Sequence, residues 1–329
     1  MPDLTPTTST GPNPYVFAVG CPRSGTTLLQ RMLDNHPMLA VANDSHFIPR
    51  AIEDVPLGVD PELTPELVEW VRTYRRFYRL GLDDDAVREA ASVSSSYAGF
   101  VGALYSIYAR VHGKELGGEK TPDYVRHLPR LHALFPDART IHIIRDGREV
   151  ALSVLEWAHD GKGPSKLALW DDEPVAVCAM WWRWLVTTGR RDGRALGPDR
   201  YRETRYEELV DHPETTLADL AEFLGLPNSP EMANFHAGRT IRRPGLSAKK
   251  AWLPPTAGLR NWHVDMPARD RELFEALAGG LLSELGYERS VDHVSAEVAV
   301  LAERCRRWWD GDRARRADRW ASASGAAGT

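Results

Sequence analysis

YVFAVGCPRSGTTLLQRMLDNHP, residues 15–37, carries the strongest fold signal in this sequence. Residues 15–19 are apolar and β-rich, which predicts a short buried strand. Leucine and methionine then recur at helical spacing as far as Asn35, with Pro37 just beyond, so a helix is expected there. A glycine-rich loop, residues 20–27, joins the two elements. The order strand, loop, helix predicts an α/β fold in which backbone N–H groups of the loop face an anion.

The loop has the frame G-x-x-x-x-G-x-T of a phosphate-binding loop, but Thr26 stands where a nucleotide triphosphatase places its lysine. The cation of this loop is Arg23 instead. The block P-R-S-G-T-T brings a guanidinium, three hydroxyls and a glycine close together, which suits a multiply charged oxyanion. The alternative is that Gly20 and Gly25 serve only to make the turn. The candidate anion-binding residues are Arg23, Ser24, Gly25, Thr26 and Thr27.

Length and composition narrow the class of protein. The 329 residues, 43% hydrophobic and 26% charged, are enough for one large α/β domain with a helical insertion. A net charge of −5 argues against bulk binding of nucleic acid and favours an anionic small molecule. The three cysteines form no C-x-x-C pair, so neither a zinc site nor a disulfide framework is indicated. Residues 1–14 lack the pattern of a signal peptide and no run reaches membrane-spanning length, so we expect a soluble cytoplasmic protein that binds no membrane.

Asp44 and His46 lie two residues apart in the segment V-A-N-D-S-H-F, which is expected to form a loop. Two ionisable groups this close to each other suggest chemistry. The alternative is that Asp44 caps the next helix and that His46 packs beside Phe47.

A second informative block begins with the β-rich run of residues 140–144, which Arg145 follows. Asp146 and Glu149 form a capping-box pattern, so a helix is expected to begin at once and to carry Ser153 about two turns in. Arg145 and Ser153 are therefore a second pair that faces an anion. The alternative is that R-D-G-R is an exposed turn with ion pairs.

Three segments together resemble one family: PRSGTTLLQRMLDNHP, then EKTP with Lys120, then IIRDGREVALS. They are similar to the sulfotransferases that use 3′-phosphoadenosine 5′-phosphosulfate (PAPS), especially the branch with the tyrosylprotein sulfotransferases and many bacterial members. The resemblance covers roughly residues 15–287. It implies a three-layer P-loop-like fold, in which helices flank a central parallel sheet. It also implies a sulfotransferase domain over residues 15–290 with a helical insertion at about 60–115.

The resemblance implies transfer of a sulfonate from PAPS to an acceptor hydroxyl, with PAP as the product. Because the sequence shows no signal peptide or membrane anchor, we predict a small-molecule acceptor, phenolic or carbohydrate. Arg23 and the loop would hold the 5′-phosphosulfate, and Lys120 matches the catalytic lysine of the family. Arg145 with Ser153 would hold the 3′-phosphate. The implied cofactor-binding set is Arg23, Ser24, Gly25, Thr26, Thr27, Arg145, Ser153 and Tyr206. No metal is required. The alternatives are a P-loop kinase or nucleotide hydrolase, and a non-catalytic nucleotide-binding interaction module.

The general base falls on one of two residues. The family branch has a glutamate where this chain, counted from Arg23, has Asp44. Asp44 is the favoured base because it keeps that register, and His46 is the alternative. If His46 is the base, activity should fall on acidification through roughly pH 6 to 7, the imidazole range.

The helical pattern of residues 64–111 predicts the insertion. Its aromatics, at helical spacing, are more often core than the lining of an acceptor cleft; they are Trp70, Tyr74, Phe77 and Tyr78. Asp211 and Glu214 predict a second capping box, ahead of a helix that Gly225 ends.

The remaining segments are basic. Residues 239–250 contain five Lys and Arg and no carboxylate. The resemblance implies that this region forms a mobile loop that closes over the phosphates of the cofactor, although the family lysine falls near Trp252. Residues 291–329 predict an Arg- and Trp-rich helix that packs on its own domain, and then a disordered tail. The alternatives for this helix are a homodimer contact and the binding of an acidic partner. Residues 1–14 are also expected to be disordered.

Overall fold

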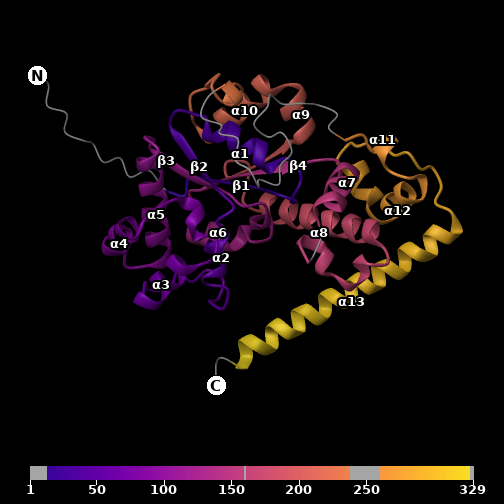
Figure 1. Cartoon of the computed structure of the whole chain (residues 1–329), viewed down its shortest axis with the longest axis horizontal. Helices are drawn as coiled ribbons and strands as arrows, with labels where there is room; N and C mark the ends of the chain where they lie inside the picture. Colours follow the sequence, from indigo (N-terminus) through magenta and orange to yellow (C-terminus); the bar gives the residue numbers. More distant parts are fainter. Residues whose placement is uncertain (1–12, 159–160, 238–259, 327–329) are drawn as a thin grey trace, which may run out of the picture. The chain divides into compact units, whose positions relative to one another are not determined.

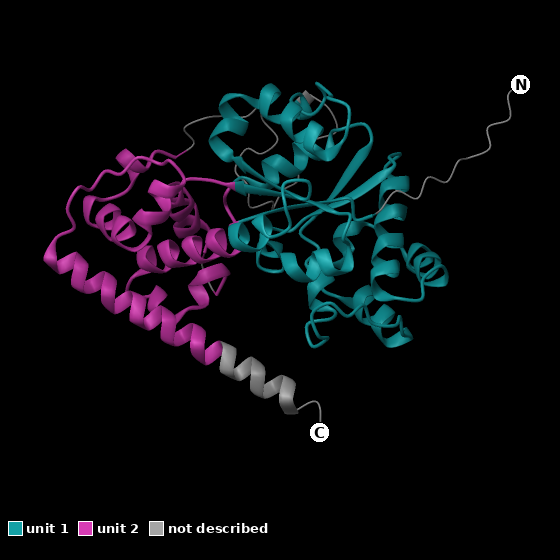
Figure 2. Ribbon diagram, turned by 180° about the vertical axis from the view of Figure 1, so that it is seen from behind, with its two compact units in different colours: residues 1–20, 25–143, 189–255 teal, residues 21–24, 144–188, 256–329 magenta. Residues whose placement is uncertain are grey.

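The computed structural model describes residues 13–158, 161–237 and 260–326, with side chains as far as residue 316. The chain forms two compact units (Figure 2). Unit 1 comprises residues 1–20, 25–143 and 189–255, and unit 2 comprises residues 21–24, 144–188 and 256–329. The basic segment predicted at 239–250, with Trp252, lies outside the described residues.

A five-stranded sheet forms the centre of unit 1 (Figure 1). Its spatial order is β2-β3-β1-β4-β5, where β1 pairs in parallel with β3 and β4, and β3 pairs in parallel with β2. The strands are β1 (Val16–Gly20), β2 (Leu39–Asn43), β3 (Leu116–Lys120), β4 (Arg139–Ile144) and β5 (Tyr201–Arg205). All five residues of β1 are buried, as expected for a parallel strand covered on both faces. The predicted first strand and parallel sheet are confirmed.

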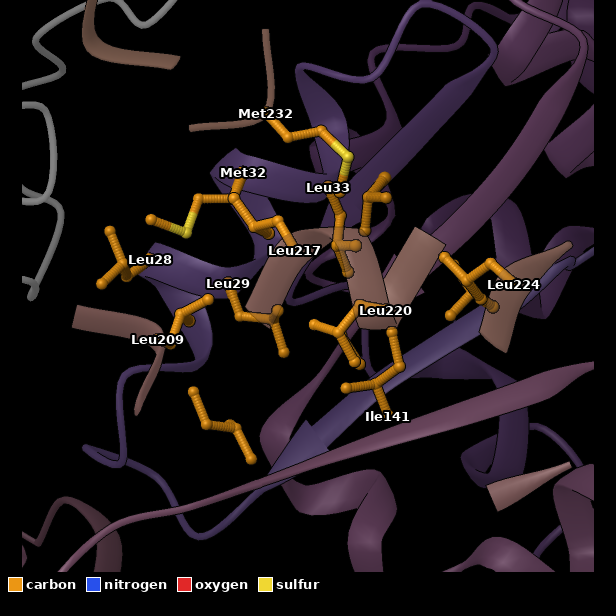
Figure 3. Packing of buried hydrophobic residues seen from close by; sticks show 14 of the residues in the cluster. Leu28, Leu29, Met32, Leu33, Ile141, Leu209, Leu217, Leu220, Leu224 and Met232 are labelled. Atoms are coloured by element: carbon orange, nitrogen blue, oxygen red, sulfur yellow. The ribbon is translucent and has the colours of Figure 1, made fainter. Parts of the chain in front are cut away.

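One face of the sheet is covered by three helices, α1 (Thr26–Asp34), α9 (Tyr206–Asp211) and α10 (Pro213–Leu224). Figure 3 shows the apolar stripe of α1 packed among side chains of these helices and of β4. The labelled residues are Leu28, Leu29, Met32, Leu33, Ile141, Leu209, Leu217, Leu220, Leu224 and Met232. This cluster fixes the helix that follows the phosphate loop against the sheet.

The other face is reached by the alternate side chains of β1, because successive residues of a strand point to opposite faces. The ring of Phe17 contacts Tyr124 and Phe135, at centroid distances of 6.2 and 6.0 Å. Helix α5 (Tyr97–Val111) packs so tightly on β3 that a Cβ on Gly117 would lie 2.3 Å from the Tyr105 carbonyl oxygen. The elements η2 (Pro122–Arg126) and α6 (Leu128–Leu134) follow β3. The predicted three layers are therefore present.

The chain between β2 and β3 is helical, as its periodicity predicts. Its elements are α2 (Phe47–Arg50), α3 (Pro65–Thr73), η1 (Phe77–Leu80), α4 (Asp84–Ser92) and α5. Thr64, Asp83 and Ser96 cap three of these helices by accepting hydrogen bonds from backbone N–H groups. The sequence thus provides an N-capping side chain for each of α3, α4 and α5.

The aromatic residues of this insertion divide between core and surface. Phe77 is buried and packs edge-on against Phe47, at a centroid distance of 5.9 Å. Trp70 and Tyr78 are exposed, and Trp70 stacks on Tyr74. The core interpretation is correct for Phe77 and wrong for Trp70 and Tyr78, because helical spacing alone does not show which face of a short helix is covered.

Unit 2 is mainly helical. Its elements are α7 (Gly147–Trp157), η3 (Gly163–Lys166), η4 (Ala168–Trp170), most of α8 (Pro174–Arg194), α11 (Trp262–Asp265), α12 (Ala268–Glu284) and α13 (Ala296–Ala326). The C-terminal helix α13 packs on α12, and its Trp309 ring lies 6.3 Å from that of Trp184. The predicted C-terminal helix is present and packs on its own unit. A homodimer contact stays a prediction.

The second predicted capping box is wrong. Asp211 is the last residue of α9, and α10 begins at Pro213 with His212 at its N-cap. Proline suits the first position of a helix because its fixed φ is helical and it has no N–H to satisfy. The predicted end of α10 is correct, since Gly225 adopts φ 66° there.

None of the helices in the described part of the chain is long and apolar enough to cross a membrane. The cytoplasmic location and the domain boundaries stay predictions.

Candidate active site

Most of the predicted site residues stand at the carboxyl end of a strand or just after it, and Ser153 lies within α7. The phosphate loop follows β1, Asp44 follows β2 and Lys120 ends β3. Arg145 follows β4, and Tyr206 follows β5. In open α/β sheets, ligands bind outside the carboxyl ends of the strands. The topology therefore supports the residues that the sequence singles out.

In unit 1, Lys120 and Asp44 form an ion pair, with Nζ 3.1 Å from Oδ2. The Lys120 side chain is 1% exposed and that of Asp44 is 27% exposed. The backbone N–H of Asp44 also donates to the Lys120 carbonyl, at 2.7 Å. Lys120 Nζ lies 3.5 Å from Oγ1 of Thr27 in the phosphate loop. The structure thus brings together the predicted catalytic lysine, the favoured base and one loop hydroxyl.

The pKa of Asp44 is held below its usual value. Burial alone would raise this pKa, but the charges of Lys120, His46 and Arg76 and the hydrogen bond from Lys120 together lower it. Asp44 is therefore ionised near neutral pH, in the form that accepts a proton.

His46 lies at the edge of the same cluster, with Nε2 4.0 Å from Asp44 Oδ1. Burial, and then the charge of Arg76, lower its pKa to about 4, against the opposing charges of Asp44 and Asp123. A histidine with this pKa is neutral at neutral pH, so in this environment we expect no loss of activity through pH 6 to 7. Which residue is the base stays a prediction.

The alternative in which Asp44 caps the next helix is wrong, because the N-cap position of α2 is His46. The His46 ring packs edge-on against Tyr124.

Backbone strain marks the same residues. Among the residues that the structure describes, three non-glycine residues adopt left-handed backbone: Arg23 (φ 78°), Asp44 (φ 60°) and His46 (φ 62°). Such residues are uncommon, and strained ones cluster where a site holds side chains in fixed directions. All three belong to the site that the sequence predicts. The strain is thus an independent observation in favour of this site.

The phosphate loop is shaped to hold an oxyanion. Gly25 is the N-cap of α1 with φ 90°, and a Cβ there would lie 2.2 Å from Cδ2 of Tyr206. Tyr206, predicted to bind the cofactor, thus packs against the loop. The Ser24 hydroxyl is buried and has no hydrogen-bond partner among the described residues. The first N–H groups of a helix also lack acceptors within it. These unsatisfied donors fit a phosphate or sulfonate oxygen.

In unit 2, Arg23 is joined to Ser153. Its Nε donates to Ser153 Oγ at 3.0 Å, and its guanidinium lies 5.7 Å from the centroid of the Trp157 ring. Burial, and then the charges of Arg260 and Arg145, lower the pKa of Arg23 to about 10. The guanidinium groups of Arg260 and Arg145 therefore lie within electrostatic range of Arg23, an arrangement that suits a highly charged anion.

Arg145 is buried, and its guanidinium pairs with Glu149, with Nε 3.1 Å from Oε2. Asp146 caps α7 as predicted, because its Oδ1 accepts from the backbone N–H of Arg148 at 2.9 Å. Glu149, the other residue of the predicted capping box, pairs with Arg145, one turn earlier.

Sequence reasoning missed two arginines near the site. Arg76, just before Phe77, influences the pKa of both Asp44 and His46. The charge of Arg260 lowers the pKa of Arg23, and the Arg260 guanidinium pairs with Glu156 at 3.1 Å. Arg260 could have been found as the cation of R-N-W, which follows the basic segment 239–250. Arg76 gave no signal beyond its place in an aromatic-rich run.

The described residues include no cluster of three or more His, Cys, Asp or Glu side chains placed to hold a metal ion. That the reaction needs no metal stays a prediction.

A parallel sheet with a glycine loop between β1 and α1, and with basic residues after its strands, defines a P-loop-like nucleotide-binding protein. The model described as the sulfotransferase family matches residues 14–230. The chain belongs to this family. The resemblance and the enzyme class predicted from the sequence are confirmed.

Relatives and solved structures agree with this assignment. The chain is 26% identical to the zebrafish (Danio rerio) protein-tyrosine sulfotransferase 1 over 84% of its own length and 72% of that protein. It is 26% identical to the nodulation protein NoeE of Sinorhizobium fredii over 89% of its own length and 73% of that protein. The sulfotransferase domain from the curacin biosynthetic pathway shares the fold, with a TM-score of 0.58 and 23% identity over 84% of this chain and 98% of that domain.

Coverage of other relatives is smaller. The chain is 27% identical to protein-tyrosine sulfotransferase A of Caenorhabditis elegans over 65% of its own length, and the match spans 50% of that protein. The match to the protein-tyrosine sulfotransferase of Drosophila melanogaster spans 38% of that protein. The activity of those whole proteins therefore enters only as a proposal.

Proposed function

We propose that this protein transfers the sulfonate group of PAPS to an acceptor hydroxyl and releases PAP. The observation that carries the proposal is the buried Lys120, ion-paired with Asp44 and close to Thr27 of the phosphate loop. A cation and a carboxylate thus lie beside a loop that fits an oxyanion. A member of the sulfotransferase family needs such a combination.

The loop and the guanidinium groups fit PAPS, which supplies the activated sulfonate. Arg23 and residues 24–27 would hold the 5′-phosphosulfate. The buried Ser24 hydroxyl, which has no hydrogen-bond partner among the described residues, could donate to one of its oxygens. Arg145 and Ser153 would hold the 3′-phosphate. The hydrogen bond from Arg23 to Ser153 supports a shared role for the two sets. Tyr206, packed on Gly25, would keep the loop in shape.

Lys120 and Asp44 would have separate tasks in the transfer. The Lys120 ammonium, nearly free of solvent, would stabilise negative charge that builds on the leaving phosphate, where a preorganised cation is most effective. Asp44, ionised near neutral pH, would accept the proton of the acceptor hydroxyl. Both tasks are matters of position and charge, as in phosphoryl transfer.

The acceptor class needs a direct comparison. Our prediction is a small hydroxylated molecule, phenolic or carbohydrate. A tyrosyl side chain in a protein is the second candidate, because several relatives are named protein-tyrosine sulfotransferases. A P-loop kinase is disfavoured, because Thr26 stands in the position of its lysine.

Incubation with ³⁵S-labelled PAPS and a panel of phenols, oligosaccharides and tyrosyl peptides tests the proposal. We expect label on one acceptor class with the wild-type protein and almost none with Asp44→Asn. Equal labelling by both proteins would contradict the proposed base. Binding of PAP without transfer to any hydroxyl would favour a non-catalytic binding module instead.

A further inference from the structure

Glu119 precedes Lys120 at the end of β3, and its side chain is wholly buried. Oε1 accepts a hydrogen bond from the backbone N–H of Ser45 at 2.9 Å and one from the Thr121 hydroxyl. Oε2 accepts from the Tyr105 hydroxyl at 2.7 Å. These are three donors aimed at one carboxylate, which in its ionised form only accepts. Both carboxylate oxygens of Glu119 therefore accept hydrogen bonds from neighbouring residues.

The most informative of these partners is Ser45, which lies between Asp44 and His46. Both neighbours adopt left-handed backbone, so this three-residue loop is strained on each side of the bond to Glu119. The preceding N–H, that of Asp44, donates to the Lys120 carbonyl. Consecutive N–H groups of the loop are thus bound by consecutive residues of β3.

We propose that Glu119 is a positioning residue that holds the strained loop so that Asp44 stays beside Lys120. The inference rests on the proposed function, since it assigns Glu119 a task in placing the base. Glu119 acts through the Ser45 N–H and need not touch either substrate. Without this hydrogen bond, the backbone of Asp44 would be free to leave its left-handed conformation, and its carboxylate would move away from the reacting hydroxyl.

The first variants are Glu119→Ala and Glu119→Gln. A displacement of about 1 Å can cost about 10²-fold in rate, so we expect Glu119→Ala to lower kcat by that order while KM for PAPS and PAP affinity stay the same. Glu119→Gln should restore most of kcat. Its amide oxygen can accept from Ser45 and Thr121, and its NH₂ can donate to the Tyr105 hydroxyl, which also accepts.

A matched pair on α5 keeps the test informative if Glu119→Ala fails to fold. Tyr105→Phe removes a buried hydroxyl bound to Glu119, whereas Tyr97→Phe removes a buried hydroxyl that donates to the Ile48 carbonyl at 2.9 Å. We expect a larger loss of kcat for Tyr105→Phe than for Tyr97→Phe. Equal losses in this pair, or a fall of PAP affinity in parallel with kcat in Glu119→Ala, would overturn the assignment.

Amide hydrogen exchange gives a readout that does not depend on activity. The Asp44 and Ser45 amides should exchange faster in Glu119→Gln and faster still in Glu119→Ala, while amides of β1 keep their protection. Unchanged exchange at Ser45 would contradict the role of Glu119 even if the wild-type protein proved inactive. A wild-type protein that transfers no sulfonate would contradict the proposed function alone.

Discussion

The ammonium group of Lys120 lies 3.1 Å from the carboxylate of Asp44. The residue proposed to stabilise the leaving group therefore also holds the proposed base, and it contributes to the lowered pKa of that base. A base with a lower pKa is weaker. Any phosphosulfate oxygen that drew Lys120 away would raise the pKa of Asp44 and so strengthen it for proton transfer.

Lys120→Met should have two effects. It removes a preorganised cation, so kcat should fall by about 10²- to 10³-fold with a smaller change in KM for PAPS. It also removes the main charge that opposes the effect of burial, so the pKa of Asp44 should rise. Steady-state kinetics and a ¹³C NMR titration of the Asp44 carboxyl group test these effects. A change confined to KM would make Lys120 a binding residue only.

Variants at Asp44 and His46 identify the base. Asp44→Asn should lower kcat by about 10²- to 10⁴-fold and leave PAP binding intact, because the amide keeps the shape but accepts no proton. His46→Ala should be milder, and Asp44→Glu, the family residue, should keep activity.

The pH profile adds a check on the base. Since the pKa of Asp44 is below its usual value and that of His46 is about 4, ionisation of either group should leave the rate flat on acidification from pH 8 to 6. A rate that falls with a midpoint near pH 6.5, and loses this fall in His46→Ala, would assign the base to His46.

How far the sequence could predict this site depends on how local each signal is. The strand, the glycine loop and the helix of residues 15–37 are encoded by adjacent residues, and they form as expected. The Arg23–Ser153 hydrogen bond joins residues 130 positions apart, so the spacing of motifs could not show it. Motif reasoning placed these two residues on different phosphates of the cofactor.

Arg148 shows the same limit more strongly. In R-D-G-R it reads as one more surface cation, but its side chain is fully buried. It pairs with Asp146 and with Glu275, which lies 127 positions further on, and its guanidinium lies 3.4 Å from the centroid of the Trp262 ring. Only folding brings these partners together, and they are what makes a buried arginine tolerable.

Arg145→Ala tests the assignment of the 3′-phosphate. A charge-assisted contact of about 1.5 to 3 kcal/mol would be lost only with a ligand that carries this phosphate. PAP affinity should therefore fall by about 10- to 150-fold, and AMP affinity should change little. The control is Arg110→Ala, an exposed arginine of α5 that pairs with Glu89. Equal losses for PAP and AMP would reject the assignment.

Gly25→Ala tests the shape of the phosphate loop. The variant adds backbone strain of about 1 to 3 kcal/mol at φ 90° and drives Cβ into the Tyr206 ring. Gly58→Ala is a matched control, because Gly58 has φ 87° with nothing within 4 Å of an added Cβ. We expect loss of PAP binding in Gly25→Ala alone. Similar PAP affinities for both variants would show that contact between Tyr206 and the loop does not matter.

The central claim is that this site binds the 3′-phosphorylated nucleotide of sulfonate transfer rather than a nucleoside triphosphate. Isothermal titration of the wild-type protein with PAP and with ATP, each with and without magnesium, tests it without knowledge of the acceptor. We predict that PAP binds more tightly than ATP and that magnesium leaves PAP affinity unchanged. Preference for magnesium-bound ATP, or no binding of PAP, would contradict the account.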